Sequence, residues 1–306
     1  MANGILADRN RIITGAVDEG GWSPLAPASN ARILPLKMKA RSFGPGLDDA
    51  PVVLQGTFDE RYPITYAGLF DTNLRQAERV RLRLYASTAM TDVSLLFDTR
   101  DAVTGEDRKV VPGGLSEWRQ LRWGDANLFR GDLPPDDFWL YPTNVHVAVP
   151  MVRAAAYRWD LYGVGYKPDP ARPDKPIDAG YLEIGHAWFS DCIQFRINYS
   201  YGGSDGWNPT DEIKRTPGGG SFVEPGTGYR SADIPLEYIT KPDGNRLFDL
   251  SKRVGWSKPV VWLPNMDDPA ELFRYGFIGQ RRDSFAKTWK HYRLDGATIK
   301  IEEITT

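Results

Sequence analysis

The sequence predicts a mainly β fold: a β-sandwich or jelly roll, preceded by an N-terminal arm and followed by a smaller α+β region. Glycine and proline account for 30 and 23 of the 306 residues, about 17% where average usage is about 12%. Aromatic residues are also frequent, with 10 Trp, 14 Tyr and 13 Phe. Several short stretches alternate apolar and polar residues between turn-forming residues, which is typical of antiparallel β architectures.

Residues 1–50 are predicted to form an extended, irregular arm. Glycine and proline recur too often here for a regular helix or strand, from Gly15 to Gly46. Apolar side chains such as Ile12, Trp22 and Ile33 are enough to dock the arm on another surface, although not to build a core. Because arms of this kind often lie along a neighbouring subunit, we expect that placement.

Residues 51–197 are predicted to form the sandwich, with a loop-rich insertion at about 98–144. The clearest strand is 79–85, in which Val80, Leu82 and Leu84 alternate with arginines. This period of two indicates a strand with one buried face. The other predicted strands are 52–58, 64–70, 93–97, 145–149, 154–162, 181–189 and 192–197.

Residues 198–306 are predicted to form a smaller α+β assembly region. Residues 201–230 are rich in Gly, Pro and Thr and are interpreted as loop. The Asp243-Gly-Asn245 stretch is predicted to cap a helix that ends at Gly255. The remaining predicted elements are strands at 259–263, 285–294 and 297–304 and a short helix that begins at Asp268-Pro269.

Charge and composition disfavour several classes of protein. Lys and Arg number 38 against 40 Asp and Glu, a net charge of −2, so the basic surplus of a dedicated nucleic-acid binder is missing. Mean hydropathy is −0.44, and no apolar run approaches the roughly 20 residues of a membrane-spanning helix. The single cysteine, Cys192, excludes an intrachain disulfide and points to a reducing compartment. The first residues do not resemble a secretory signal, so we expect cytoplasmic folding.

One stretch matches a catalytic motif. Gly202-Gly-Ser204-Asp-Gly206 has the spacing G-x-S-x-G of a nucleophile elbow, in which the serine lies on a strand-to-helix turn. Trp207-Asn-Pro209 follows where the helix should begin, and the only downstream histidine is His291. We interpret the stretch as a flexible turn, and we expect neither enzymatic activity nor a cofactor.

Metal ligation and carboxylate catalysis are not favoured either. Each histidine lies in a predicted strand with no second His or Cys at ligand spacing. Adjacent aspartates occur beside proline or glycine in predicted turns, and helix capping already explains Asp268. A weak calcium site in the insertion is the alternative. The residues weighed here are His146, His186, His291, Asp48, Asp49, Asp132, Asp136, Asp137, Asp267 and Asp268.

Aromatic residues of the insertion are the candidate contact residues. Trp118, Trp123, Trp139 and Tyr141 lie in a loop-rich stretch of a predicted sandwich. Such side chains stack on the apolar faces of sugar rings, but they also anchor loops and fill cores. We therefore take these four as candidate contacts with a glycan or a partner protein.

The layout of the chain resembles a known class of proteins. An arm ending in Leu34-Pro35-Leu36 precedes Ala67-Gly-Leu-Phe-Asp-Thr-Asn-Leu74 and Arg79-Val-Arg-Leu-Arg-Leu-Tyr85. This order is similar to distal tail or minor tail-tip structural proteins of long-tailed, siphovirus-like bacteriophages, which carry a discoidin-like (galactose-binding-like) β-sandwich. The resemblance continues at Glu183-Ile-Gly185 and Ile299-Lys-Ile-Glu-Glu303. It does not cover residues 98–144.

The resemblance implies a structural role. It suggests a subunit of the virion tail, assembled in the host cytoplasm, that forms a homo-oligomeric ring and links the tail tube to the hub and fibres. It carries no catalytic signature, no cofactor and no nucleic-acid partner. The alternative is a carbohydrate-binding module that contacts glycan on the host surface. Ring formation or copurification with tube protein distinguishes the first from the second.

Overall fold

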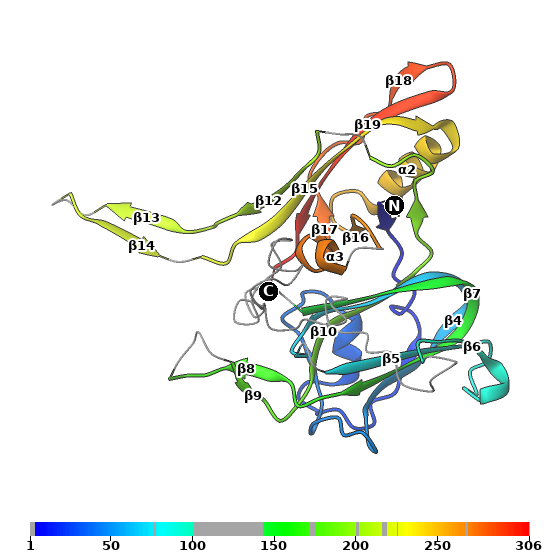
Figure 1. Ribbon diagram of the computed structural model, residues 1–306, viewed down its shortest axis with the longest axis vertical. Coiled ribbons are helices and arrows are strands. Elements are labelled where there is room, and N and C mark those ends of the chain that lie inside the picture. The colour runs from blue at the N-terminus through cyan, green and yellow to red at the C-terminus, as the bar shows by residue number, and fades with distance from the viewer. Residues whose placement is uncertain are drawn as a thin grey trace, which may run out of the picture. The chain divides into compact units, whose positions relative to one another are not determined.

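The computed structural model describes residues 4–75, 78–100, 143–171, 176–199, 202–215, 219–224, 226–266 and 269–305. Contacts divide the chain into two units. Unit 1 comprises Met1–Asp8, Ile193–Met266 and Tyr275–Thr306, and unit 2 comprises Arg9–Cys192 and Asp267–Arg274. Each contains one large antiparallel sheet (Figure 1), so the predicted mainly β class is confirmed. Within the described ranges, no helix is both long and apolar enough to cross a membrane.

Unit 2 contains a seven-stranded sheet in the order β3-β10-β4-β7-β5-β6, with β2 pairing β4. Its elements are β2 (Ala16–Val17), η1 (Ala28–Arg32), β3 (Ala40–Arg41), β4 (Val52–Thr72), β5 (Arg79–Tyr85), η2 (Asp92–Ser94), β6 (Leu95–Asp98), β7 (Thr143–Tyr162), β8 (Tyr166–Pro168), β9 (Pro176–Asp178), β10 (Glu183–Ser190) and all but the last residue of α3 (Pro269–Tyr275).

Two long, bent strands make this single sheet into a sandwich. β4 and β7 pair along their lengths, with register shifts between Thr57 and Tyr62 and between Ile64 and Tyr66. On one side of the bend the sheet continues through β5 to β6, and on the other through β10 to β3. The sequence predicted two separate strands where β4 runs, and again where β7 runs. The exposed polar residues 59–61 mark a bend in β4 rather than its end.

The two layers share one aromatic core. Phe189 of β10 has its ring centroid 4.6 Å from that of Tyr157 on β7 and 5.5 Å from that of Phe58 on β4. Tyr157 and Phe58 lie on the opposite side of the bend from the strand segments that pair with β10. The predicted strand 79–85 is confirmed as β5, whose Val80, Leu82 and Leu84 all lie in this core.

The N-terminal segment is tied into the fold rather than extended from it. β1 (Ile5–Ala7) belongs to the sheet of unit 1, while Ile12 and Trp22 are buried in the core of unit 2. Trp22 Nε1 donates a hydrogen bond to the carbonyl of Val53, at 2.8 Å. Docking on a neighbouring subunit is therefore not what buries these two side chains.

Asn10 joins the N-terminal segment to β10 through a buried histidine. Its Oδ1 accepts from the amides of Ile12 (3.3 Å) and Phe189 (3.1 Å), which fixes the orientation of the amide group. Nδ2 therefore faces the carbonyl of Ala187 at 2.8 Å and Nε2 of His186 at 3.0 Å. Because Nδ2 only donates, Nε2 of His186 must accept, and the imidazole is neutral with its proton on Nδ1.

Unit 1 contains an eight-stranded sheet in the order β11-β1-β16-β17-β19-β15-β12, with β18 pairing β19. A second, two-stranded sheet is formed by β13 and β14. Its elements beyond β1 are β11 (Ile193–Gln194), β12 (Ser204–Asn208), β13 (Glu212–Arg215), β14 (Ser221–Glu224), β15 (Tyr229–Thr240), α2 (Lys241–Val254), β16 (Pro259–Leu263), β17 (Phe277–Arg281), β18 (Thr288–His291) and β19 (Leu294–Glu303).

Helix α2 begins earlier than the sequence predicted. Its N-cap is Thr240, whose Oγ1 accepts from the Asp243 amide at 3.4 Å and donates to Asp243 Oδ2 at 2.8 Å. The predicted cap at 243–245 was wrong because Pro242 fits the first turn, where its missing N–H costs nothing. The predicted end at Gly255 is confirmed, with a φ of 58° that favours glycine. Leu247 and Leu250 face the core of unit 1.

The cap yields a modest prediction about stability. Thr240→Ala should lower the free energy of unfolding by about 1 kcal/mol, because the first turn loses its side-chain acceptor. Thr240→Ser keeps the hydroxyl and should retain most of that free energy. Urea denaturation of the two variants measures the difference. Equal stability of Thr240→Ala and the unaltered chain would contradict this role.

Candidate functional site

The largest element that the sequence analysis missed is a β-ribbon in unit 1. β12 pairs with the first half of β15, from Ser204 opposite Asp233 to Asn208 opposite Tyr229. β13 then pairs with β14 in the same antiparallel sense. Figure 1 shows these four strands continuing one another away from the large sheet. We call β12, β13, β14 and residues 229–233 of β15 the ribbon.

Side-chain hydrogen bonds connect the two halves of the ribbon. Thr210 Oγ1 donates to the carbonyl of Thr227 at 2.7 Å, and the amide of Gly226 donates to Asp211 Oδ1 at 2.8 Å. Glycine is required at position 226, since a Cβ there would lie 2.4 Å from the Thr210 carbonyl oxygen. The segment between β12 and β13 and the segment between β14 and β15 therefore stay together, although neither is part of a strand.

The outer half of the ribbon exposes large apolar side chains. Ile213 is 69% exposed, Phe222 61% and Val223 50%. Ile213 lies directly opposite Val223, so these two share one face, while Phe222 lies opposite Lys214 on the other. Among the described strands, none pairs with the outer edge of β13 or β14. A two-stranded hairpin is only marginally stable alone, so this half of the ribbon suits a partner surface.

A buried ion pair fixes the ribbon to the sheet. Arg230 Nε donates to Glu303 Oε2 at 2.9 Å, and Arg230 Nη2 donates to Glu303 Oε1. Arg230 Nη1 reaches the carbonyl of Gly276 at 3.2 Å, and its guanidinium lies 5.4 Å from the ring of Phe277. Both charged side chains are at least nine-tenths buried. The base of the ribbon is thus held by a bidentate, charge-assisted contact to β19.

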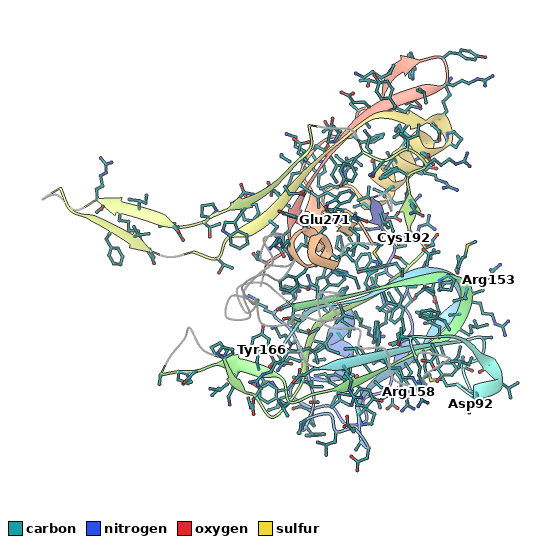
Figure 2. The ribbon with its side chains drawn as sticks, viewed as in Figure 1. Asp92, Arg153, Arg158, Tyr166, Cys192 and Glu271 are labelled. Atoms are coloured by element: carbon teal, nitrogen blue, oxygen red, sulfur yellow. The ribbon has the colours of Figure 1, made fainter. Side chains whose placement is uncertain are left out.

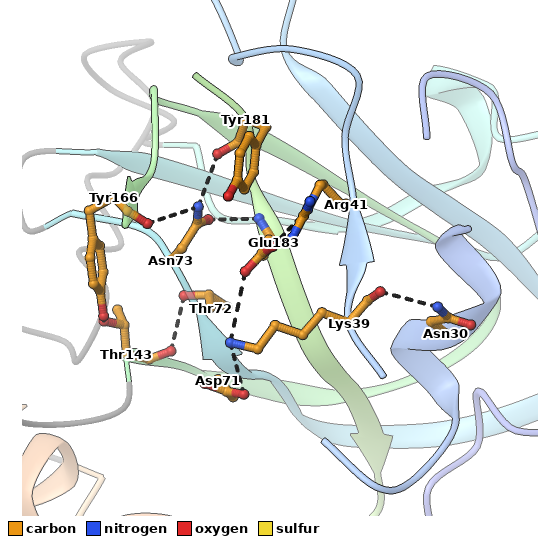
Figure 3. Close-up of polar contacts among 10 residues, drawn as sticks. All are labelled: Asn30, Lys39, Arg41, Asp71, Thr72, Asn73, Thr143, Tyr166, Tyr181 and Glu183. Atoms are coloured by element: carbon orange, nitrogen blue, oxygen red, sulfur yellow. Dashed lines mark hydrogen bonds and ion pairs between the residues drawn. The ribbon is translucent and has the colours of Figure 1, made fainter. Parts of the chain in front are cut away.

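Unit 2 carries a second polar cluster, shown in Figure 3. Lys39 Nζ lies 3.1 Å from Asp71 Oδ2 and 3.9 Å from Glu183 Oε2. Arg41 Nε donates to Glu183 Oε1 at 2.8 Å. Each charge in this half-buried cluster faces one of opposite sign, so the cluster joins β3, β4 and β10 and offers no activated nucleophile or base.

Asn73 extends this cluster into the backbone. Its Nδ2 donates to the carbonyls of Tyr181 (3.0 Å) and Tyr166 (3.3 Å), and its Oδ1 accepts from the Glu183 amide at 2.6 Å. Burial raises the pKa of the Tyr166 hydroxyl, so that side chain stays neutral. These bonds hold the strand ends in place, which is a structural function.

The stretch with G-x-S-x-G spacing does not form a nucleophile elbow. Gly202 has a φ of 96°, as a turn requires, but Ser204 begins β12 instead of preceding a helix. A turn occurs only at the first of these residues, because 204–208 are a paired strand rather than the predicted turn. Ser204 has no histidine opposite it, since its partner in β15 is Asp233.

The three histidines lie on three different strands. His146 is on β7, where Nδ1 lies 2.7 Å from the Tyr66 hydroxyl, and His186 is on β10. His291 is on β18. Cys192, labelled in Figure 2, is the last residue of the long segment of unit 2, and its Sγ lies 3.7 Å from Ser190 Oγ. No group of three or more His, Cys, Asp or Glu placed to hold a metal occurs among the described residues.

The candidate contact residues of the insertion lie outside the described residues. Trp118, Trp123, Trp139 and Tyr141 fall in 101–142, as do the aspartates of the alternative calcium site. Their assignment to a glycan or a partner stays a prediction. Asp48, from one of the aspartate pairs, contacts Arg79 in an exposed ion pair.

The ribbon had a signal in the sequence. Ile213-Lys-Arg-Thr-Pro-Gly-Gly-Gly-Ser-Phe-Val223 places two short β-forming stretches on either side of a glycine-rich turn, which is a hairpin pattern. The high content of Gly, Pro and Thr across 201–230 concealed it. Exposure of both strands removes the hydrophobic alternation that marks a half-buried strand.

No protein-family model and no curated protein matches the sequence. Among solved structures, the chain is similar to CBM32-1 from a family 31 glycoside hydrolase of Clostridium perfringens, at 10% identity over 60% of this chain and 99% of that one, with a TM-score of 0.35. A histidine mutant of the lectin binding domain of lectinolysin, complexed with Lewis b, gives 7% identity over 60% and 99%, with a TM-score of 0.33. The virion of a native gene transfer agent particle gives 16% over 36% and 93%, with a TM-score of 0.26. These values identify neither a ligand nor a partner for this chain.

Proposed function

We propose that the chain is a non-enzymatic structural subunit of a bacteriophage tail tip, which assembles with copies of itself into a ring and connects the tail tube to the hub and fibres. The observation that carries the proposal is the ribbon. It exposes Ile213, Phe222 and Val223 on β13 and β14, whose outer edges pair with no other described strand. The parts of the proposal that concern the virion tail and the ring rest on the resemblance of the sequence to tail-tip structural proteins of long-tailed bacteriophages.

The ribbon suits a contact between neighbouring copies. The proposal is that the apolar end of the ribbon docks on a different part of a neighbouring copy. Such a contact is heterologous, and it closes into a ring when the rotation permits. The buried Arg230–Glu303 pair supports such a contact, since it holds the ribbon in one position before assembly. Preorganisation of this kind lowers the cost of association.

Removal of the apolar side chains at the ribbon tip should abolish self-assembly. The triple variant Ile213→Ser, Phe222→Ser and Val223→Ser should weaken the contact at least about 1,000-fold, because each large apolar side chain contributes about 1.5–3 kcal/mol when buried. Analytical ultracentrifugation of the full chain measures the change from ring to monomer. Far-ultraviolet circular dichroism confirms that the variant is folded.

A matched control separates this contact from a general loss of apolar surface. Val93→Ser with Met151→Ser changes two exposed apolar side chains of unit 2, which are 99% and 75% exposed. This control should assemble like the unaltered chain. Equal assembly by the ribbon variant, or a monomeric unaltered chain even with tube protein added, would contradict the proposal.

A further inference from the structure

A second exposed surface of unit 1 combines aromatic and basic side chains. It lies where the β18–β19 hairpin meets helix α2. Lys241 Nζ of α2 is 5.6 Å from the ring of Tyr292, and Lys287 Nζ donates to Asn245 Oδ1 at 3.3 Å. The basic aromatic tip, as we call it, consists of Lys241, Phe248, Trp289, Lys290, Tyr292 and Arg293.

The aromatic side chains of the tip are exposed to an unusual degree. Trp289 is 86% exposed, Tyr292 80% and Phe248 56%. Tyr292 and Arg293 form the tight turn between β18 and β19, since His291 pairs with Leu294 across it. Figure 1 shows this turn projecting beyond α2. The tip is therefore convex, with its aromatic rings on the outside.

The two chain segments that contribute to the tip are rich in positive charge. Residues 238–258 and 281–295 contain ten Lys or Arg and four Asp, although the whole chain has a net charge of −2. Four of these cations pair with carboxylates, in the pairs Arg253–Asp8, Arg281–Asp283, Arg282–Glu302 and Lys287–Asp295. The remaining six are exposed and, over the ranges that the structure describes, form no ion pair. Lys241, Lys290 and Arg293 belong to the tip, and Arg246, Lys252 and Lys258 follow along α2 and beyond its end.

Few carboxylates offset the three cations of the tip. Asp243 is buried in the helix cap, and Asp283 and Asp295 belong to the ion pairs above. Asp249 is the one exposed acidic residue left in the two segments, and the exposed Glu237 just before them lines a hollow together with Lys290. The tip therefore presents a local positive surface to which an anionic partner is complementary.

From this charge and shape we infer that the basic aromatic tip binds the surface of an anionic phospholipid membrane. Trp and Tyr side chains have an apolar body and a polar end, so they are stable at the boundary between headgroups and acyl chains. Each Lys or Arg near an anionic leaflet adds about fivefold in affinity. A convex tip fits a lipid surface, whereas a single-stranded nucleic acid is usually held along a groove. The contact is peripheral.

Flotation of the purified full chain with lipid vesicles tests the inference. We expect binding to vesicles of phosphatidylcholine with phosphatidylglycerol and none to phosphatidylcholine alone. Raising the salt from about 0.1 M to about 1 M should release the protein, because the screening length falls from about 10 Å to about 3 Å. The inference is independent of ring assembly, which the ribbon variants test.

Two variants separate the charge from the aromatic rings. Lys290→Gln with Arg293→Gln should lower the affinity for anionic vesicles about 25-fold, at about fivefold for each cation. Trp289→Ser with Tyr292→Ser should lower it at least about tenfold, because insertion of the rings is lost. Lys37→Gln with Arg153→Gln removes two exposed cations of unit 2, of which Figure 2 labels Arg153. This variant should bind like the unaltered chain.

Three results would overturn the inference. The first is equal binding, or no binding, to both kinds of vesicle. The second is unchanged binding of the two tip variants, with near-ultraviolet circular dichroism confirming that they are folded. The third is binding of a single-stranded oligonucleotide without binding of vesicles, which would assign the tip to nucleic acid.

Discussion

Arg230→Met should lower the free energy of unfolding of unit 1 by about 3–5 kcal/mol. The Glu303 side chain is only 7% exposed and would lose its cationic partner. Of its contacts with residue 230, it would retain only the hydrogen bond from the backbone amide, at 3.0 Å. Removing one partner of a buried ion pair costs about 3–5 kcal/mol of stability, because the remaining charged group is buried without an opposite charge. Chemical denaturation measures the loss, and hydrogen exchange at the amides of β15 and β19 assigns it to unit 1.

Two companion variants show whether the buried pair is the cause. Arg230→Met with Glu303→Gln removes both charges and should recover most of the loss, since a neutral pair has no unpaired charge to desolvate. Lys300→Met breaks a pair on the same two strands, in which Lys300 and Asp233 are 58% and 37% exposed. That change should cost less than about 1 kcal/mol. Equal losses for Arg230→Met and Lys300→Met would refute the argument from burial.

Acid should destabilise unit 2 through His186. Burial lowers the pKa of this imidazole to about 4, against about 6.5 in an unfolded chain. The unfolded state therefore binds more protons between these values, and stability is lost as the pH falls from about 6.5 to about 4. A difference of this size corresponds to about 3 kcal/mol. The hydrogen bonding of His186 also disfavours protonation, because a proton on Nε2 would face the Asn10 amino group, which can only donate.

Comparison with a neutral side chain isolates this histidine from the carboxylates that titrate in the same range. His186→Gln should lose about 3 kcal/mol less than the unaltered chain between pH 6.5 and pH 4. Nuclear magnetic resonance titration of the His186 ring gives the pKa directly. Parallel stability curves for the two proteins, or a titration near pH 6.5, would show that His186 is not the acid-sensitive group.

The parts of the fold that sequence predicted well are half-buried strands. The bounds of β5 were predicted correctly because Val80, Leu82 and Leu84 alternate with arginines along the strand. The apolar side chains lie in the core, and the arginines lie on the more exposed face. β4 and β7 were each predicted as two strands, since the break in alternation at a bend looks the same as a turn. The cap of α2 was misplaced because Thr240 is also the last residue of β15.

The candidate site was less accessible to sequence reasoning. Ile213 and Phe222 lie on strands exposed on both faces, so no alternation of apolar and polar residues marks them. Arg230 and Glu303 are 73 positions apart, and only the pairing of β15 with β19 brings them together. The basic aromatic tip is also concealed in the totals, because its surplus of Lys and Arg is offset elsewhere in the chain.

Immunogold electron microscopy of purified particles from the source, with antibody against this chain, tests the central claim most directly. A structural subunit of the tail tip should give label confined to the distal end of the tail. Absence of label on every particle, with the chain soluble and monomeric in the lysate, would contradict a structural role in the tail. In that case, sugar binding through Trp123 and Trp139 becomes the hypothesis to test next, by glycan affinity of Trp123→Ala and Trp139→Ala.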